Sequence, residues 1–271
     1  KIKKNDLVVL GWIKGKGIDT NGGIYKYKNK IINSGPVTTF STFTIVSENR
    51  IIKLPKQYSL REAVLFGCAI PTGAGMIFNQ IKNVREKTIC ITGLGGVGFM
   101  ALIACKALNC KKIIAIDINN KKLKMAKDLG ANYTINYNNK NLKSKINKIT
   151  NSKGVDYGVD CAGKVSTIEF SFSIINKNKG KCLFCSHPTH GEKIKIDPLE
   201  LISGKKIQGS WGGDVHPDKH IKIIAKKFIR YKAKLNKLIA KDYPLDSINE
   251  AINDLKNGNV LRPIISINKD L

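Results

Sequence analysis

The sequence lacks the features of membrane proteins and of nucleic-acid-binding proteins. None of its apolar runs approaches the ~20 residues that a transmembrane helix needs. Arginine is scarce, and lysine spread over the whole chain supplies nearly all of the net charge of +27. A nucleic-acid-binding surface more often clusters arginine with aromatic residues. We therefore expect neither a membrane nor a nucleic-acid partner. The arginines are Arg50, Arg61, Arg85, Arg230 and Arg262.

Metal-ligating residue types are missing from the first part of the chain. The segment from Lys1 to Gly67 contains neither histidine nor cysteine. Seven cysteines follow, most of them inside apolar runs, where a free thiol behaves as a small apolar side chain. Their odd number and the lack of a signal peptide favour the reducing cytoplasm. Because the chain begins at Lys1 in the middle of a pattern, we expect that an N-terminal piece is missing.

The stretch from Lys87 to Asp117 has the pattern of a nucleotide-binding unit. An apolar run at 88–92 leads into the glycine turn GLGGVG at 93–98, and an apolar helical pattern follows. A second apolar run then ends at Asp117. The order of strand, glycine turn, helix, strand and acid is the context in which this glycine motif indicates dinucleotide binding.

Each residue of this unit has a physical role. Gly93 allows a sharp turn, Gly95 leaves room for a pyrophosphate, and Gly98 lets the helix pack close to the strand. The helix N-terminus offers free N–H groups to the phosphates. Asp117 can accept hydrogen bonds from the ribose hydroxyls and would repel a 2′-phosphate, which favours NAD over NADP. A tight turn in an unrelated α/β protein is the weaker alternative.

The rest of the chain predicts regular alternation, followed by a different C-terminal region. Strands separated by helices imply a doubly wound, mostly parallel sheet. The predicted strands are 88–92, 112–117, 133–136, 155–160, 180–186 and 206–210. The predicted helices are 97–109, 120–129, 139–150, 165–176 and 197–203, and in the C-terminal region 218–231 and 246–257.

The first part of the chain predicts short strands and turns. A hairpin is expected around 21–23, where Asn is followed by two glycines. Strands are expected at 37–46 and 50–54. Ser59 with Glu62 three residues later is typical of a helix start.

An ordered series of motifs is similar to the zinc-containing alcohol dehydrogenases of the medium-chain dehydrogenase/reductase superfamily. The resemblance implies an α/β fold: a Rossmann doubly wound parallel sheet at 70–211, plus a partial GroES-like β-barrel catalytic domain at 1–69 and 212–271. It also implies an NAD-dependent oxidoreductase that interconverts an alcohol and an aldehyde or ketone, with zinc polarising the oxygen. The motifs are DLVVL, VTTFSTFTIV, GCAIPTG, GLGGVG, IDINNKKLKMAKDLGA, GVDYGVDCAG, PLDSINEAINDLKNG and RPIISI.

The resemblance assigns roles to individual positions. Cys68 matches the last of three protein ligands to the catalytic zinc, and Thr72 matches a residue that contacts the nicotinamide. Lys122 matches an adenosine-ribose contact, as does Asp117, and Arg262 matches a basic residue that reaches the coenzyme phosphate. Without the resemblance, Cys68 would be a buried cysteine at a helix start, and the two cations would be surface residues. The pyrophosphate loop matches at Gly93, Gly95, Gly96, Val97 and Gly98.

The sequence also departs from the family. The other two zinc ligands, a Cys and the His of a Gly-His-Glu motif, do not occur, and we expect them upstream of Lys1. The loop at 11–36 lacks the four cysteines of a structural-zinc lobe, so we expect no structural zinc. The set Cys182, Cys185, His187 and His190 has the residue types of a zinc site but too short a gap between its pairs. His216 and His220 are spaced like a helical metal pair, but Pro217 indicates that a helix begins between them.

Two other functions remain open at this point. One is a zinc-free NAD(P)H quinone or enoyl reductase of the same superfamily, against which Cys68 and Asp117 argue. The other is a non-catalytic NAD-binding fragment. The resemblance implies a small-molecule alcohol or aldehyde substrate and a homodimer or homotetramer, for which the segment from Lys181 to Trp211 is the expected interface.

Overall fold

The chain folds into two compact units. The computed structural model describes residues 2–32, 34–239 and 241–267. Unit 1 comprises Lys1–Pro71 and Val215–Leu271, and unit 2 comprises Thr72–Asp214. The domain boundaries expected from the sequence, after 69 and after 211, fall close to these. The interpretation of unit 1 as a GroES-like catalytic domain stays a prediction.

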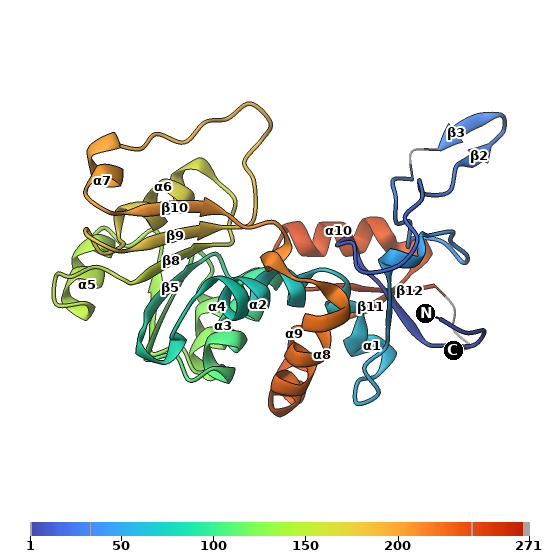
Figure 1. Ribbon diagram of the computed structural model, residues 1–271, viewed down its shortest axis with the longest axis horizontal. Helices are drawn as coiled ribbons and strands as arrows, with labels where there is room; N and C mark the ends of the chain where they lie inside the picture. Colours follow the sequence, from blue (N-terminus) through green and yellow to red (C-terminus); the bar gives the residue numbers. More distant parts are fainter. Residues whose placement is uncertain (1, 33, 240, 268–271) are drawn as a thin grey trace. The chain divides into compact units, whose positions relative to one another are not determined.

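Unit 2 is built on one six-stranded parallel sheet in the order β10-β9-β8-β5-β6-β7 (Figure 1). The chain starts in the middle at β5, adds β6 and β7 on one side, and then crosses to add β8, β9 and β10 on the other. This order confirms the predicted doubly wound sheet, and it creates a topological switch point between β5 and β8. The strands are β5 Thr88–Thr92, β6 Lys112–Asp117, β7 Tyr133–Asn136, β8 Tyr157–Asp160, β9 Lys181–Phe184 and β10 Lys206–Gly209.

Helices connect these strands, as parallel pairing requires. The most deeply buried is α3, in which every residue from Phe99 to Cys105 is at most 1% exposed. A helix that is apolar on all sides belongs in the interior, so α3 forms part of the core of the unit. The connecting helices are α3 Gly96–Ala107, α4 Asn120–Asp128, α5 Leu142–Ile149, α6 Val165–Ser173 and α7 Pro198–Ile202, and α2 Ala69–Gln80 precedes β5. Those predicted from Thr88 onward are all present, with ends shifted by a few residues.

Unit 1 contains short strands that pair two by two. In the described residues, β1 Val8–Leu10 pairs with β4 Ile51–Lys53, and β2 Tyr25–Tyr27 pairs with β3 Lys30–Ile32. The parallel pair is β11 Asp242–Pro244 with β12 Ile264–Ser266. The helices of this unit are α1 Leu60–Ala63, α8 Pro217–Phe228, α9 Lys232–Leu238 and α10 Ile248–Lys256.

Two helix starts in unit 1 follow the sequence prediction. Ser59 Oγ accepts the N–H of Glu62 at 3.3 Å, and Glu62 Oε2 accepts the N–H of Ser59 at 2.9 Å. This capping box satisfies two donors at the start of α1. Helix α8 begins at Pro217, as the proline predicts, because a missing N–H costs nothing in the first helical turn.

The predicted hairpin around 21–23 was placed wrongly. The observed turn joins β2 to β3 at Lys28 and Asn29, which have φ of 44° and 61°, the left-handed values that a tight two-residue hairpin needs. Gly22 instead lies against Pro36: a Cβ on Gly22 would stand 2.7 Å from the Cα of Pro36. The glycine is there because two backbone segments approach each other, not because the chain turns.

The predicted strand at 37–46 does not form. This segment has the β-branched and aromatic residues of a strand, but Phe43 is 86% exposed and Ile45 is 69% exposed. The N–H of Ile45 donates to the side-chain hydroxyl of Tyr25 at 2.9 Å. A side chain therefore takes the donor that a strand ladder would use, and strand propensity without a partner face is not sufficient.

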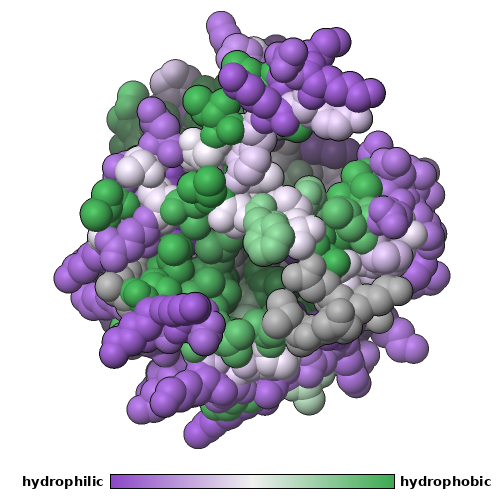
Figure 2. All heavy atoms as spheres, turned by 90° about the vertical axis from the view of Figure 1, so that its right-hand side faces the viewer, coloured by the Kyte–Doolittle hydropathy of each residue, from purple (hydrophilic) through white to green (hydrophobic). Residues whose placement is uncertain are grey.

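Apolar side chains are exposed on unit 1. Figure 2 shows them gathered on one face, with hydrophilic side chains around the margin. Patches of this kind commonly mark surfaces that contact other protein. The large apolar residues exposed in this unit include Leu7, Ile18, Ile24, Ile31, Phe40, Phe43 and Ile45.

Within the residues that the structure describes, no single helix is both long and apolar enough to cross a membrane. Only the bent pair Leu60–Gly67 with Ala69–Gln80, at an angle of 59°, reaches the required length and composition. Much of its second helix is buried in the protein, with Ile70, Met76 and Ile77 fully inaccessible.

Candidate functional site

The glycine turn between β5 and α3 is held by close backbone contacts. Gly93 has a φ of +90°, and a Cβ there would lie 2.7 Å from the backbone nitrogen of Ala162. A Cβ on Gly98 would overlap the carbonyl oxygen of Gly93. Gly95 is different, because a Cβ on it would meet no atom within 4 Å. Two of the glycines are therefore needed for packing, whereas the third leaves an open space beside the backbone.

The N-terminus of α3 faces this open space without a side-chain cap. Its N-cap residue is Gly95, which has no side chain to accept the first N–H groups of the helix. These groups and the helix dipole give the turn a partial positive charge. An anionic group such as a pyrophosphate fits such a terminus.

A cavity of about 540 Å³ lies at the carboxyl ends of the central strands of unit 2. Its volume is within the range of ligand pockets, about 300–1,000 Å³. The cavity lies at the switch point, where ligands bind in open α/β sheets. Its walls are Thr92, Gly93, Leu94, Gly95, Ile116, Asp117, Ile118, Lys122, Tyr137, Asn138, Cys161, Ala162, Lys164, Ser166 and Thr167.

Asp117 joins the second strand to the glycine turn. Its side chain is only 8% exposed. Oδ2 accepts the N–H of Leu94 at 2.6 Å, and Oδ1 accepts the N–H of Asn119 at 2.8 Å. Each carboxylate oxygen can accept a further hydrogen bond, so the group is fixed in place and still able to bind two hydroxyls.

Lys122 lies on the same cavity wall, in the first turn of α4. The N–H groups of that turn are occupied, because Asn119 Oδ1 accepts those of Lys121 at 2.8 Å and of Lys122 at 3.3 Å. An anion at this wall would therefore meet the Lys122 ammonium and not the helix terminus.

The remaining predicted residues lie elsewhere. Thr72, at 6% exposure, is near the start of α2, and a Cβ on the next residue, Gly73, would overlap the carbonyl oxygen of Val97 in α3. The structure thus brings the start of α2 against the glycine turn. Cys68 and Arg262 belong to unit 1, and neither lines the cavity.

Comparisons with known proteins give a consistent result. Residues 96–226 match the family model of zinc-binding dehydrogenases. The chain is 33% identical over 231 residues to a class-2 alcohol dehydrogenase isozyme of Oryctolagus cuniculus, covering 84% of this chain and 60% of that protein. Residues 96–226 are therefore similar to the zinc-binding dehydrogenases.

Solved structures agree with this assignment. Benzyl alcohol dehydrogenase from Acinetobacter calcoaceticus superposes with a TM-score of 0.77 at 30% identity, covering 83% of this chain and 62% of that one. An alcohol dehydrogenase zinc-binding domain protein from Burkholderia ambifaria gives the same score and identity, with 83% and 60% covered. The chain spans about 60% of the length of these relatives. The resemblance inferred from the sequence motifs is therefore confirmed.

Residues able to hold zinc do not come together in the described part of the chain. Across residues 2–32, 34–239 and 241–267, no three His, Cys, Asp or Glu side chains form a group that could hold a metal ion. Cys68 is exposed in front of α2. Since a catalytic zinc takes three protein ligands, these residues do not fit the metal.

The two other sets with zinc-like spacing have ordinary surroundings. Cys182 is fully buried, whereas His187 is exposed with Nδ1 2.7 Å from the carbonyl oxygen of Pro188. At the start of α8, the N–H of His216 donates to His220 Nδ1 at 3.1 Å.

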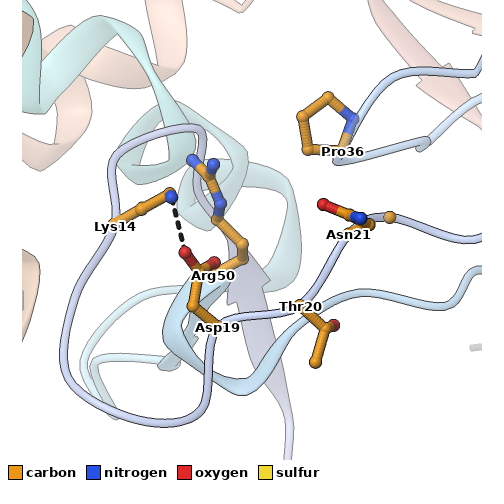
Figure 3. A pocket seen from close by; sticks show the side chains of 7 residues that line it. Lys14, Asp19, Thr20, Asn21, Pro36 and Arg50 are labelled. Carbon is orange, nitrogen blue, oxygen red and sulfur yellow. Dashed lines mark hydrogen bonds and ion pairs between the residues drawn. The ribbon is translucent and has the colours of Figure 1, made fainter.

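A second cavity, of about 430 Å³, lies in unit 1 at the loop that would correspond to the structural-zinc lobe (Figure 3). Lys14 Nζ is 2.5 Å from Asp19 Oδ2 in its wall. The hydrogen bond from Lys14 lowers the pKa of Asp19. Arg50 and Asn21 also line this polar cavity, and its lining contains no thiol or imidazole. The expectation of no structural zinc stays a prediction.

Sequence reasoning named four of the fifteen residues that line the main cavity, Gly93, Gly95, Asp117 and Lys122, and missed the others. Tyr137 and Asn138 follow β7, and Cys161 to Lys164 follow β8. Their only shared property is that each follows a parallel strand at its carboxyl end. The rule that ligands bind at these ends would have found them once the strand order was known.

The buried Asp160 at the end of β8 provides a pH-dependent test of this region. Its side chain is inaccessible to solvent, and Oδ2 accepts the N–H of Gly163 at 2.9 Å. Burial raises the pKa of Asp160 above its ordinary value of 3.8. The hydrogen bonds from Gly163, Thr167 and Ala162 lower this pKa, but their effect is smaller than that of burial. The charged form is therefore disfavoured in the folded protein, and stability falls as pH rises from below 3.8 through the raised pKa.

We expect Asp160→Asn to remove this pH-dependent loss. The variant should gain stability relative to wild type as pH rises from 4 to 8, by about 1 kcal/mol or roughly 2–4 °C in Tm. Thermal unfolding followed by circular dichroism across that pH range measures the difference. A difference between the two proteins that stays constant from pH 4 to 8 would contradict the assignment of a raised pKa.

Proposed function

We propose that this chain carries the coenzyme-binding part of an NAD-dependent oxidoreductase that interconverts an alcohol and an aldehyde or ketone. The observation that supports it is the cavity at the switch point, with the uncapped α3 terminus on one wall and the Asp117 carboxylate on another. An alcohol dehydrogenase is 33% identical to this chain over 231 residues, and benzyl alcohol dehydrogenase superposes on it with a TM-score of 0.77. The substrate is proposed only as a class, a small alcohol or its carbonyl product.

The residues of the cavity suit the two ends of an adenosine diphosphate group. The α3 N–H groups and the space beside Gly95 would receive the pyrophosphate. Asp117 would accept the ribose hydroxyls, with Lys122 beside it. When bound, NAD supplies the carbon that exchanges hydride with the substrate. The contribution of this chain is to bind the coenzyme and to keep its diphosphate in one place.

The preference for NAD over NADP follows from the fixed position of Asp117. The two backbone hydrogen bonds that the carboxylate accepts keep it in place at the end of β6. A 2′-phosphate at the ribose would lie beside this negative charge and be repelled. The cavity is lined by two lysines, Lys122 in the first turn of α4 and Lys164 after β8. Their long flexible side chains are weaker determinants than the buried carboxylate, which is fixed by two backbone N–H groups.

Zinc chemistry is not assigned to the described residues, because they do not provide a ligand set. We propose that Cys68 contributes to a zinc site only where further protein supplies the remaining ligands. The family resemblance and the partial coverage of the relatives, about 60% of their length, support this proposal. The role of Arg262 as a coenzyme contact is proposed on the same resemblance.

The coenzyme site is tested by titrating NADH and NADPH into the purified chain. Gly95→Ala should weaken NADH binding at least tenfold and leave Tm unchanged, because its Cβ meets no protein atom and occupies only the ligand space. Gly98→Ala is the matched control: its Cβ overlaps a backbone oxygen, so it should lower Tm. Asp117→Ser should reduce the preference for NADH over NADPH.

Tighter binding of NADPH than of NADH by the wild type at physiological salt would overturn the NAD assignment. Equal NADH affinity in the wild type and in Gly95→Ala would show that the coenzyme does not bind beside the glycine turn.

The zinc proposal predicts coenzyme binding without turnover for residues 1–271. Zinc content after dialysis should be well below one ion per chain, because a single exposed thiolate holds the ion weakly. Cys68→Ser should therefore leave NADH affinity unchanged. Metal analysis together with alcohol oxidation assays on both proteins gives the result. Zinc-dependent turnover that is lost in Cys68→Ser would show that the chain completes the site by itself.

We also propose a homodimer, or a tetramer built from such dimers, through the edge of the unit 2 sheet. The expected interface segment from Lys181 to Trp211 includes β9, but β9 is flanked by β8 and β10 and cannot extend the sheet. Of the two edge strands, β10 and β7, only β10 lies within this segment, next to Trp211 at 80% exposure and Ile202 at 80%. Open strand edges with apolar neighbours favour pairing.

Sedimentation velocity at micromolar concentration should therefore show a dimer or larger species. Trp211→Glu should shift the population toward monomer, because a charge at the edge opposes association. Ile252→Glu, at a 42% exposed position on α10 of unit 1, is the control and should have no effect. A wild-type monomer with an intact far-UV spectrum would contradict the proposal.

A further inference from the structure

Two cysteines stand opposite each other at the carboxyl ends of neighbouring strands. Cys161 follows β8 and Cys185 follows β9, and the register pairs Asp160 with Phe184, the residues immediately before them. The N–H of Cys185 donates to the carbonyl oxygen of Asp160 at 3.3 Å, so the pairing continues to this point. The thiol of Cys185 donates to the same carbonyl oxygen of Asp160 at 3.7 Å, which places its sulfur beside the residue that precedes Cys161.

This arrangement is suited to a disulfide bond. Adjacent strands lie about 4.8 Å apart, and disulfides join Cα atoms that are about 4.4–6.8 Å apart. Residues at paired positions of a parallel ladder project to the same face of the sheet. Both cysteines are partly exposed, so a small reagent can reach them.

The pair is continuous with the coenzyme cavity. Cys161 and Ala162 are part of the cavity wall. A Cβ on Gly98 would stand 3.5 Å from Cys161 Cβ, and one on Gly93 would stand 2.7 Å from the nitrogen of Ala162. The segment that carries Cys161 therefore packs directly on the glycine turn, and a shift of Cys161 would be transmitted to that turn.

The two thiols differ in reactivity. The pKa of Cys185 is lowered, because the interaction with the neighbouring Cys161 thiol lowers it by more than burial raises it. The thiolate is the reactive form, so Cys185 is the nucleophile of the pair. In contrast, burial raises the pKa of Cys182 to about 12, which leaves that thiol unreactive.

We propose that Cys161 and Cys185 are a modification site at which a low-molecular-weight disulfide such as oxidised glutathione forms a reversible intramolecular disulfide. The Cys185 thiolate attacks one sulfur of the reagent, whose S–S bond breaks and releases one thiolate. The Cys161 thiol then loses its proton and attacks the Cys185 sulfur, releasing the second thiolate. Two protein thiols are oxidised, and one reagent disulfide is reduced to two thiols.

The disulfide should weaken coenzyme binding. It draws Cys161 toward β9 and away from the position that packs on Gly98, so it alters the cavity wall at Ala162. By linkage, bound NADH should in turn oppose formation of the disulfide by the same factor. This consequence rests on the proposed coenzyme function, whereas formation of the disulfide does not.

The test incubates the reduced chain with oxidised and reduced glutathione at several ratios, with and without NADH, and maps disulfides by peptide mass spectrometry. We expect the Cys161–Cys185 linkage, a loss of the mass of two hydrogens, at least fivefold weaker NADH binding, and recovery after dithiothreitol. Cys161→Ser should accumulate a glutathione adduct on Cys185, because no second thiol displaces it. Cys185→Ser should not form an adduct at Cys161.

Cys105 and Cys110 provide a matched control pair, because they are also neighbouring cysteines in unit 2: the N–H of Cys110 donates to the carbonyl oxygen of Cys105 at 2.8 Å. Cys105 is fully buried, and Cys110 Sγ donates to the carbonyl oxygen of Lys87 at 3.2 Å, away from the cavity wall. Cys110→Ser should therefore leave both the linkage and its effect on NADH unchanged.

A disulfide mapped to Cys105–Cys110, or no intramolecular disulfide, would overturn the proposal. A Cys161–Cys185 disulfide with unaltered NADH affinity would overturn its coupling to the coenzyme. Failure of the fully reduced protein to bind NADH would instead refute the coenzyme function, and the mapped linkage would still decide whether this is the modification site.

Discussion

The close approach of Gly98 to the carbonyl oxygen of Gly93 is the contact on which the cavity depends. It allows α3 to begin directly above the end of β5, because no side chain separates the helix from the turn. The free N–H groups of α3 then point to the switch point of the sheet. A second contact, from Leu94 N–H to Asp117 Oδ2 at 2.6 Å, ties the same turn to β6. The phosphate end and the ribose end of the cavity are therefore fixed by one short loop.

The fold of unit 2 could be predicted from the sequence because its determinants are local. The apolar runs at β5 and β6 and the helical pattern of α3 specify their own elements, and parallel pairing follows from the helices between strands. Unit 1 is different. Whether Gly22 lies in a turn depends on its contact with Pro36, and whether 37–46 forms a strand depends on Tyr25 taking the Ile45 N–H. Both outcomes depend on contacts between segments that are distant in the sequence. A local sequence pattern contains no information about such contacts.

Some residues of the candidate site could likewise be predicted from local sequence, and others could not. The glycine turn and Asp117 could be found because motif and spacing encode them. Tyr137, Cys161 and Ala162 could not, because they reach the cavity only through the strand order β8-β5-β6-β7. The position of Asp117 was predicted, but its structural role was not, since its carboxylate also accepts hydrogen bonds from two backbone N–H groups. A change at Asp117 thus acts on the loop as well as on a ligand.

All residues that line the main cavity lie between Thr92 and Thr167, inside unit 2. The proposed coenzyme contacts of the glycine turn and Asp117 therefore do not depend on any residue of unit 1. The proposed zinc ligand, Cys68, belongs to unit 1 and lacks partners among the described residues. The proposed coenzyme binding and the proposed metal binding therefore involve residues of different units. Because the Cys161–Cys185 pair also lies in unit 2, oxidation of its thiols would act on coenzyme binding directly, without passing through a metal site.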